Sequence, residues 1–527
     1  MASHSLPLGY ILLRRCCFSC DSIDRLTKYK ASVLFLTFLA YMSYHLSRRP
    51  LSIVKTILNR NCTGLTPTIG ANLTDPCWCC WKPFDTDNAN SILGLLDSSF
   101  LISYAIFMFM SGFIAERCHL RYFLALGMIG SGIFTYLFGI AFYYDIHNIY
   151  YFIIIQIICG AFQTTGWPAV VAAVGHWFGP RSSRGLIFGI WNSHTNFGNI
   201  FGALIAGAFV EYNWGLSFIV PGLIVASVGF IHFLFLLPYP EEVGLLSLDT
   251  DIPEPSRSSR SEADVEATSN DSNSNSQEYS SPHRRKVGRT KRISVNSNAD
   301  EGVPLIDDDS PVTYSYERGA VSFGSALKIP GVLEFSLSLF FCKLVSYTFL
   351  YWLPKYLDDS TGSSSMVSAF LSTPFDIGGA LGAIGAGILA DRTGSPALTC
   401  ILMLLLTIPG LFVYQIFGTL GYWYNVLLQS LLGLLVNGPY ALITTAVAAD
   451  LGNKVTDTKA LATVTAIIDG TGSIGAAVGP FIAGIVSQYG WDHVFHTMMV
   501  SDVISLLFLA RIGYYEYKKL MYRDLSR

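Results

Sequence analysis

Long apolar segments recur along the chain, and they restrict its fold more than any other feature. Stretches such as 90–115, 121–143 and 216–238 each reach the ~20 residues that an α-helix needs to cross the hydrocarbon core of a bilayer. Apolar residues make up 51% of the 527 residues and charged residues only 13%, against about 25% in soluble domains. Because lipid offers backbone polar groups no partner, the sequence predicts an all-α polytopic membrane protein.

Twelve transmembrane helices are predicted, in two groups of six. We expect spans at 30–58, 90–115, 121–143, 149–177, 185–210, 216–238, 330–356, 366–390, 396–417, 421–448, 460–487 and 493–515. Residues 239–328 between the groups are rich in Ser, Asn and charge, so this segment is expected to be a disordered linker. The predicted domains are an N-terminus at 1–29, helical bundles at 30–238 and 329–515, and a tail at 516–527.

The distribution of basic residues predicts the orientation in the membrane. Most Lys and Arg residues of the short loops lie on the side that holds both termini, which indicates that the N-terminus, the linker and the tail are cytosolic. The loop 59–89 on the opposite side contains the sequons NCT and NLT, which begin at Asn61 and Asn72. We therefore predict a lumenal loop that is glycosylated at both asparagines.

The same loop carries four cysteines, Cys62, Cys77, Cys79 and Cys80. In an oxidising lumen they would form one or two disulfides that fasten the loop. Zinc binding is the weaker alternative, because the CWCC run supplies crowded sulfurs without a second pair at metal-ligand spacing. The sequence shows no nucleophile–base set and no phosphate-binding loop, so we expect neither an enzyme nor a bound cofactor or metal.

The two groups of helices resemble each other in sequence. The motif GFIAER at 112–117 is matched by GILADR at 387–392, each after the second span of its group. The stretches 198–218 and 475–495 share eight of 21 positions, including a Tyr and a Trp two residues apart. Small-residue spacing for helix packing explains the shared glycines but not the aromatic pair. A duplicated six-helix unit is therefore predicted.

A twelve-span chain with G-x-x-x-[DE]-R after its second and eighth spans resembles the major facilitator superfamily. Within it, YHLSRRP at 44–50, SYAIFMFMSGFIAER at 103–117 and RGLIFGIWNSHTNFGN at 184–199 are similar to the organophosphate:phosphate antiporters. The likeness is strongest to the sugar-phosphate exchangers of the endoplasmic reticulum, which are glucose-6-phosphate/phosphate antiporters. This resemblance implies two pseudo-symmetric six-helix bundles that give alternating access to a site at the membrane midplane.

The resemblance assigns the phosphoryl group to an arginine of the first helix. By motif position this residue is Arg48, with Arg49 as its basic neighbour. Arginine is charged at every physiological pH, and its planar fork can hold two phosphate oxygens. The alternative is that the first helix ends near Ser47 and both side chains extend to the headgroups. The apolar pattern that continues to residue 58 favours the binding role.

In the second group, the basic position of the family falls at Ser346. The nearest basic residue is Lys343, three residues earlier and on nearly the same helical face. A lysine inside the membrane is a functional candidate, and the alternative is a lysine near the cytosolic surface that extends to the headgroups. Asp469 is a further charge within a span. It would pair with a cation of the pocket or face a water-filled path.

Two positions depart from the family pattern. Met108 stands where relatives have a lysine, and the family's histidine falls at Thr195, one residue after His194. His194 would either bind phosphate in a proton-dependent way or pack inside its bundle. The predicted substrate-binding residues are Tyr41, Arg48, Arg49, Tyr104, Asn192, His194 and Lys343.

The leading hypothesis is an antiporter that exchanges glucose 6-phosphate or another sugar phosphate for inorganic phosphate across the endoplasmic reticulum membrane. Its expected partners are these two substrates and the lipid bilayer, with no nucleic acid. One alternative is a proton-coupled organic-anion symporter that uses His194 or Asp469. Another is a non-transporting membrane scaffold whose linker recruits cytosolic partners.

Overall fold

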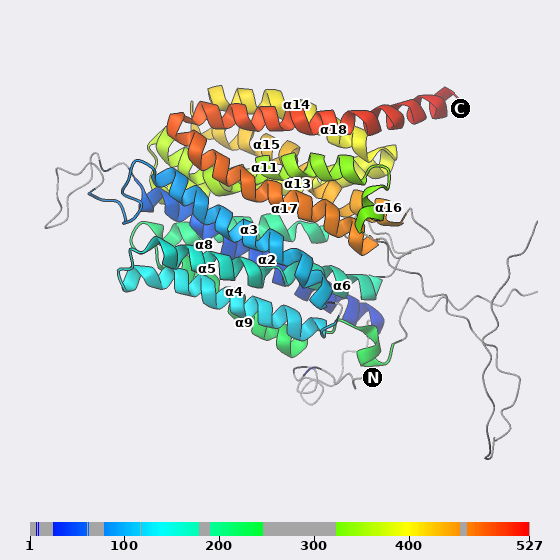
Figure 1. Cartoon of the computed structure of the whole chain (residues 1–527), viewed down its shortest axis with the longest axis horizontal. Helices are drawn as coiled ribbons and strands as arrows, with labels where there is room; N and C mark the ends of the chain where they lie inside the picture. Colours follow the sequence, from blue (N-terminus) through cyan, green and yellow to red (C-terminus); the bar gives the residue numbers. More distant parts are fainter. Residues whose placement is uncertain are drawn as a thin grey trace, which may run out of the picture. The chain divides into compact units, whose positions relative to one another are not determined.

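The computed structural model describes residues 7, 9, 25–60, 62, 78–115, 117–178, 190–245, 323–453 and 461–525, and all regular structure within them is helical. Figure 1 shows long helices that lie side by side with their axes roughly aligned. The predicted glycosylation sites Asn61 and Asn72 and the linker residues 246–322 lie outside the described residues. These predictions therefore stay untested.

Two groups of helices follow one another along the chain. The first comprises α2 (Arg25–Leu58), α3 (Ala89–Ala115), α4 (Leu120–Tyr143), α5 (Ile149–Gln163) with α6 (Gly166–Phe178), α8 (His194–Val210) and α9 (Leu216–Phe235). The second comprises α11 (Val332–Thr361), α12 (Ser365–Leu371) with α13 (Thr373–Thr393), α14 (Pro396–Phe417), α15 (Tyr422–Leu442) continued by η2 (Ile443–Val447) and α16 (Ala448–Asn453), α17 (Leu461–Val486) with η3 (Ser487–Tyr489), and α18 (Trp491–Leu525).

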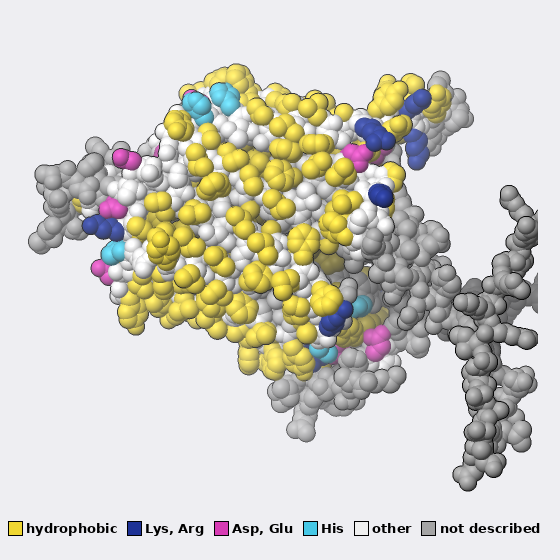
Figure 2. Space-filling model, viewed as in Figure 1, with side chains coloured by type: hydrophobic (Ala, Val, Ile, Leu, Met, Phe, Trp, Pro, Cys, Tyr) yellow, Lys and Arg dark blue, Asp and Glu magenta, His cyan; other side chains and the backbone are white. Residues whose placement is uncertain are grey.

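Most of these helices are suited to a bilayer. Among the described residues, ten helical segments are long and apolar enough to cross a membrane. The other two predicted spans correspond to α2, which carries Arg48, Arg49 and Lys55, and to α8, of which 17 residues are described. In Figure 2 hydrophobic side chains cover the middle of the visible face, while charged side chains lie at its two ends. The chain is a multi-pass membrane protein.

Helix packing repeats between the two groups. α2 packs on α8 as α11 packs on α17, α3 on α5 as α13 on α15, and α4 on α9 as α14 on α18. Gly198 and Gly475, which begin the repeated sequence stretch, allow a close approach of the facing helix. A Cβ atom at either would collide with a backbone oxygen, that of Met42 or of Phe340. The structure therefore agrees with the duplicated unit expected from the sequence.

Residues 59–88 connect α2 to α3, and we call the end of the bundle that carries them the first-loop end. In Figure 1 this end lies at the left, whereas α2 begins and α18 ends at the right. Cys62 and Cys79 form a disulfide there, and Cys80 is also disulfide-bonded. The predicted disulfide reading is confirmed, and these sulfur atoms do not form a zinc site.

Ordered structure extends into both ends of the predicted linker. The short helices η1 (Pro240–Val243) and α10 (Phe323–Leu327) lie within the range 239–328. The carboxylate of Glu242 in η1 is paired with Arg121 at the start of α4. Described helices therefore occupy both edges of the predicted linker. At the first edge the buried Arg121–Glu242 ion pair fixes residues that composition alone marks as polar and irregular.

Candidate functional site

Arg48 lies near the middle of the bundle. α2 continues as a helix through Pro50 to Leu58, so Arg48 stands ~15 Å before its end, about half of a ~30 Å hydrocarbon core. Arg48 is 5% exposed and Arg49 only 1%. The alternative in which the helix ends near Ser47 and both arginines extend to the headgroups is therefore wrong.

The guanidinium of Arg48 is surrounded by neutral groups. Its Nε donates to Oε1 of Gln163 at 2.7 Å, and its centre lies 4.7 Å from the ring centroid of Tyr104 and 5.6 Å from that of Phe100. Its buried Nη2 has no hydrogen-bond partner. Within the described part of the chain no carboxylate forms an ion pair with Arg48. A buried cation of this kind is suited to bind an anion.

Gln163 orients this arginine. Its Nε2 donates to the hydroxyl of Ser47 at 2.9 Å and to that of Ser131 at 3.0 Å. Because both amide hydrogens are used in this way, the amide oxygen points to Nε of Arg48. Gln163 could not be selected from the sequence, since its role depends on a contact between α2 and α5.

Lys343 of the second group is buried and paired. Its Nζ lies 2.8 Å from Oδ1 of Asp469 on α17, and 5.4 Å from the ring centroid of Tyr440. Lys343 is 4% exposed, which rules out the alternative of a lysine that extends to the headgroups. Ser346, at the family's basic position, donates to Asn437 at 2.8 Å. The second group therefore offers a cation that is already neutralised.

Tyrosines from both groups lie between the two cations. The ring centroid of Tyr104 lies 4.7 Å from the guanidinium of Arg48, and that of Tyr440 lies 5.4 Å from Nζ of Lys343. Tyr351 of α11 borders the same small cavity as Arg48, and Tyr347 borders a second one with Tyr440. We call these four side chains, together with Tyr41 beside His194, the ring of tyrosines.

The space around these residues is small. One cavity of about 20 Å³ adjoins Arg48, and a second of about 20 Å³ lies between His45, Asn196 and Tyr347. Each holds about one water molecule, far less than the several hundred Å³ typical of a small-molecule site. The two helical groups must move apart before a ligand of the size of a sugar phosphate can enter.

A larger cavity of about 630 Å³ lies at the opposite end from the first loop, between α11, α16 and α18. Its lining mixes apolar side chains with both charge signs, and Arg511 and Glu334 in it lie 3.5 Å apart. This cavity contains neither Arg48 nor Lys343. Its lining carries two cations, Lys328 and Arg511, and three carboxylates, Glu334, Asp450 and Glu516. Because the negative charges are in excess, this cavity is not the anion site.

Arg49 contacts the other helical group. Its guanidinium donates to the backbone oxygen of Leu350 and, at 2.8 Å, to the hydroxyl of Ser372. It also lies 3.6 Å from Asp376, which accepts a hydrogen bond from Asn199 at 2.9 Å. Among the described residues, the partners of the Arg49 guanidinium belong to α11, to α13 or to the junction of α12 and α13, so this residue links the groups.

Lys55, about two helical turns after Arg48 on α2, also joins the groups. It is paired with Asp97 of α3, donates to the backbone oxygen of Tyr351 at 3.1 Å, and lies 3.9 Å from the ring centroid of Trp352. The sequence analysis missed this site. The available signal was the presence of Lys55 and Asp97 inside apolar spans, where an unpaired charge is costly.

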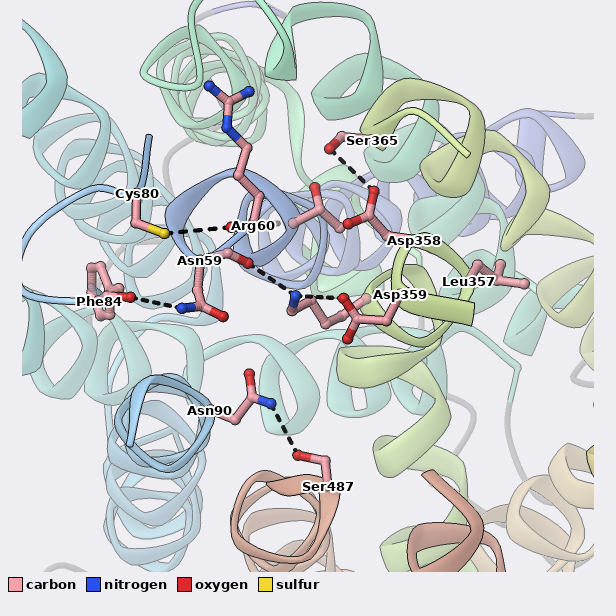
Figure 3. Close-up of polar contacts among 12 residues, drawn as sticks. Asn59, Arg60, Cys80, Phe84, Asn90, Leu357, Asp358, Asp359, Ser365 and Ser487 are labelled. Atoms are coloured by element: carbon pink, nitrogen blue, oxygen red, sulfur yellow. Dashed lines mark hydrogen bonds and ion pairs between the residues drawn. The ribbon is translucent and has the colours of Figure 1, made fainter. Parts of the chain in front are cut away.

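Further bonds close the first-loop end. Lys355 donates to the backbone oxygen of Asn59 at 2.9 Å and to Asp359 at 2.7 Å, and Asn90 donates to Ser487 at 3.3 Å (Figure 3). Together with those of Arg49 and Lys55, these contacts concentrate bonds between the two groups in the first-loop half of the bundle.

The remaining predicted residues lie beside this centre. His194 is fully buried, its ring centroid lies 4.7 Å from that of Tyr41, and its Nε2 has no hydrogen-bond partner. Tyr41 also packs on Trp167 at 5.1 Å. This aromatic cluster fits the packing alternative for His194. Asn192 is half-buried. Within the described part of the chain, Arg48 bonds to Gln163 and Lys343 to Asp469, and neither bonds to Asn192.

Two duplicated helical groups that enclose a buried cation and are bonded together at one end define a membrane transporter. The chain belongs to the Major Facilitator Superfamily, whose family model matches residues 33–456. This finding confirms the fold class expected from the sequence.

Curated relatives extend over almost the whole chain. It is 48% identical to glucose-6-phosphate exchanger SLC37A2 of Xenopus laevis over 95% of both chains, and 47% identical to that of Homo sapiens over 93% of both. Glucose-6-phosphate exchanger SLC37A1 of Homo sapiens is 44% identical, covering 93% of this chain and 94% of its own. These relatives confirm the resemblance to sugar-phosphate exchangers, and they are transporters rather than enzymes.

Among solved structures, the chain is similar to a bacterial homolog of the human lysosomal transporter Spinster in an inward-facing and occupied conformation. The TM-score is 0.58, with 15% sequence identity over 93% of this chain and 96% of that one. At this identity the comparison supports the fold alone.

Proposed function

We propose that this protein exchanges glucose 6-phosphate for inorganic phosphate across the endoplasmic reticulum membrane by alternating access. The observation that carries the proposal is the buried guanidinium of Arg48, which has no carboxylate partner among the described residues and an unused donor at Nη2. The names of the 44–48% identical relatives support the choice of substrate.

In this proposal the phosphoryl group binds between the two helical groups. Arg48 holds it from the first group, and Lys343 approaches it from the second. The ring of tyrosines that includes Tyr41 and Tyr104 would contact the sugar, because aromatic faces and hydroxyls suit a ring with alternating C–H and O–H groups. Asn192 and His194 would border this sugar site.

Alternating access requires the bonds at the first-loop end to break and re-form. We assign this end to the lumen and both termini, with the linker, to the cytosol. The structure then corresponds to a state closed toward the lumen. Asn61 and Asn72 would carry glycans in the lumenal loop. Arg49 acts in this scheme as a clamp between the groups, because its Nη1 and Nη2 donate to Leu350 and Ser372 of the second group.

Exchange by the purified protein in liposomes tests the proposal. Uptake of labelled phosphate should depend on unlabelled phosphate or glucose 6-phosphate inside the vesicles, and Arg48→Ala should abolish it. Arg511→Ala is the matched control, since Arg511 is an exposed arginine on a membrane helix far from Arg48. Normal exchange by a folded Arg48→Ala protein would overturn the assigned role.

Proton-coupled symport is the second candidate, and the buried Lys343–Asp469 pair favours it. A carboxylate that alternates between a lysine and a proton is a common means of coupling transport to a proton gradient. This candidate predicts uptake into vesicles that hold no internal phosphate when the outside is acidic. Strict dependence on internal phosphate would exclude it.

A further inference from the structure

The charges at the centre of the candidate site do not sum to zero. Arg48 contributes one positive charge that no carboxylate of the described chain balances, whereas Lys343 is balanced by Asp469 at 2.8 Å. All three side chains are buried. The site therefore holds a net charge of about one positive unit at the depth where hydration is least available.

The other titratable groups around these charges have to be counted as well. They come from α2, α3, α5, α8, α11 and α15, and they are Tyr41, Tyr44, His45, Tyr104, Cys159, His194, Tyr347, Tyr351 and Tyr440. Tyrosine and cysteine are neutral at physiological pH. Asp376, which borders the second small cavity with His45, is paired with Arg49, and Asp97 is paired with Lys55. The two histidines are therefore the remaining groups of this set that could change the sum. His45 lies 3.3 Å from Oδ1 of Asn199, and His194 lies among aromatic rings.

A phosphate monoester presents one or two negative charges, because its second proton dissociates with a pKa of about 6. A singly charged phosphoryl group would neutralise Arg48 and leave the Lys343–Asp469 pair intact. A doubly charged group would leave an excess negative charge buried unless Asp469 took up a proton. The singly charged group with ionised Asp469 and the doubly charged group with protonated Asp469 are both electrically neutral complexes. They contain the same number of protons.

On the basis of the proposed function, we infer that the site binds its phosphorylated substrate together with one proton, and that Asp469 sets this requirement by neutralising Lys343. The ligand class is thus the singly charged phosphoryl group, or its equivalent with the proton on Asp469. Removing the charge of Asp469 leaves two positive charges, so that a doubly charged phosphoryl group becomes the better ligand.

Calorimetry on the full chain in detergent tests the inference with two ligands. Glucose 6-phosphate loses its singly charged form as the pH rises, whereas glucose 6-sulfate is singly charged throughout. Between pH 5.5 and 7.5 the Kd for the phosphate ester should rise about 25-fold, which follows from a second pKa of about 6. The Kd for the sulfate ester should not change.

Variants refine this comparison. In Asp469→Asn the Kd for glucose 6-phosphate should fall about fourfold over the same pH range, as the doubly charged form accumulates. His45→Gln should keep the 25-fold rise, because its ring does not set the charge of the site. The comparison of the two esters needs no variant, so it stands even if Asp469→Asn fails to fold.

Three results would overturn the inference. They are a Kd for glucose 6-phosphate that is independent of pH in the unaltered protein, a parallel weakening of the sulfate ester, and an unchanged pH dependence in folded Asp469→Asn. Failure of the proposed function looks different: folded protein would bind neither ester, and its liposomes would show no phosphate exchange at any pH.

Discussion

Arg49 of α2 lies 3.6 Å from Asp376 of α13, and this buried ion pair joins the two helical groups. Its neighbour Arg48 has no such partner among the described residues. Adjacent residues of a helix point about 100° apart, so one guanidinium faces the space between Gln163 and Tyr104 while the other contacts the second group. In the proposed mechanism a single Arg-Arg motif thereby provides both a ligand for an anion and a clamp.

The clamp makes a prediction about stability. Asp376→Asn leaves the charge of Arg49 buried without a counter-charge, and breaking one partner of such a pair costs about 3–5 kcal/mol. Thermal unfolding in detergent should show a clear loss. The double variant Arg49→Met with Asp376→Leu should recover most of it, because an apolar pair carries no desolvation cost. Equal losses in the single and double variants would contradict the clamp.

Much of the architecture could be predicted from the sequence, because its signals are local. Apolar length marks the spans, and the aligned Tyr and Trp of 198–218 and 475–495 mark the duplication. The burial of Arg48 also followed from local pattern, since the residues after it remain apolar up to Leu58.

The partners of the charges could not be predicted in the same way. Arg49 and Ser372 are 323 positions apart in the sequence, and their contact depends on how the two groups meet. The contact between Lys55 and Tyr351 also depends on how the two groups meet, so it could not be predicted either. From the sequence, Asp469 could either pair with a cation of the pocket or face a water-filled path. Only the packing of α11 on α17 shows that it is paired with Lys343.

Gln163 offers a direct test of the charge at Arg48. Gln163→Glu places a carboxylate beside the guanidinium, where it would act as an internal competitor of phosphate. We expect the concentration of phosphate that half-saturates exchange to rise at least about tenfold, in line with the strength of charge-assisted hydrogen bonds. Gln163→Met is the matched control, because it removes the hydrogen bond without adding charge. Its smaller effect would measure orientation alone, and equal effects of both variants would contradict the competition.

The close approach of duplicated helices can be tested at two equivalent glycines. Gly198→Ala and Gly475→Ala each bring a Cβ atom against a backbone oxygen of the facing helix, and overpacking of this kind costs about 1–3 kcal/mol. Both variants should unfold at lower temperature. Gly385→Ala is the control, because no atom lies within 4 Å of its added Cβ and alanine favours a helix. A loss at Gly385 equal to the other two would contradict the packing explanation, because this substitution meets no neighbour and raises helix propensity.

Closure of the first-loop end is tested by preventing it from opening. Asn90 and Ser487 come from opposite helical groups, and their side chains are 3.3 Å apart. In the variant Asn90→Cys with Ser487→Cys, a short thiol-specific cross-linker should therefore join the groups and abolish phosphate exchange in liposomes. A cross-linker that is attached through disulfides is released by a reductant. Because alternating access requires the two helical groups to separate, this release should restore exchange. The two single variants treated with the same reagent are the controls. Full exchange by protein shown to be cross-linked would mean that this end does not open during transport.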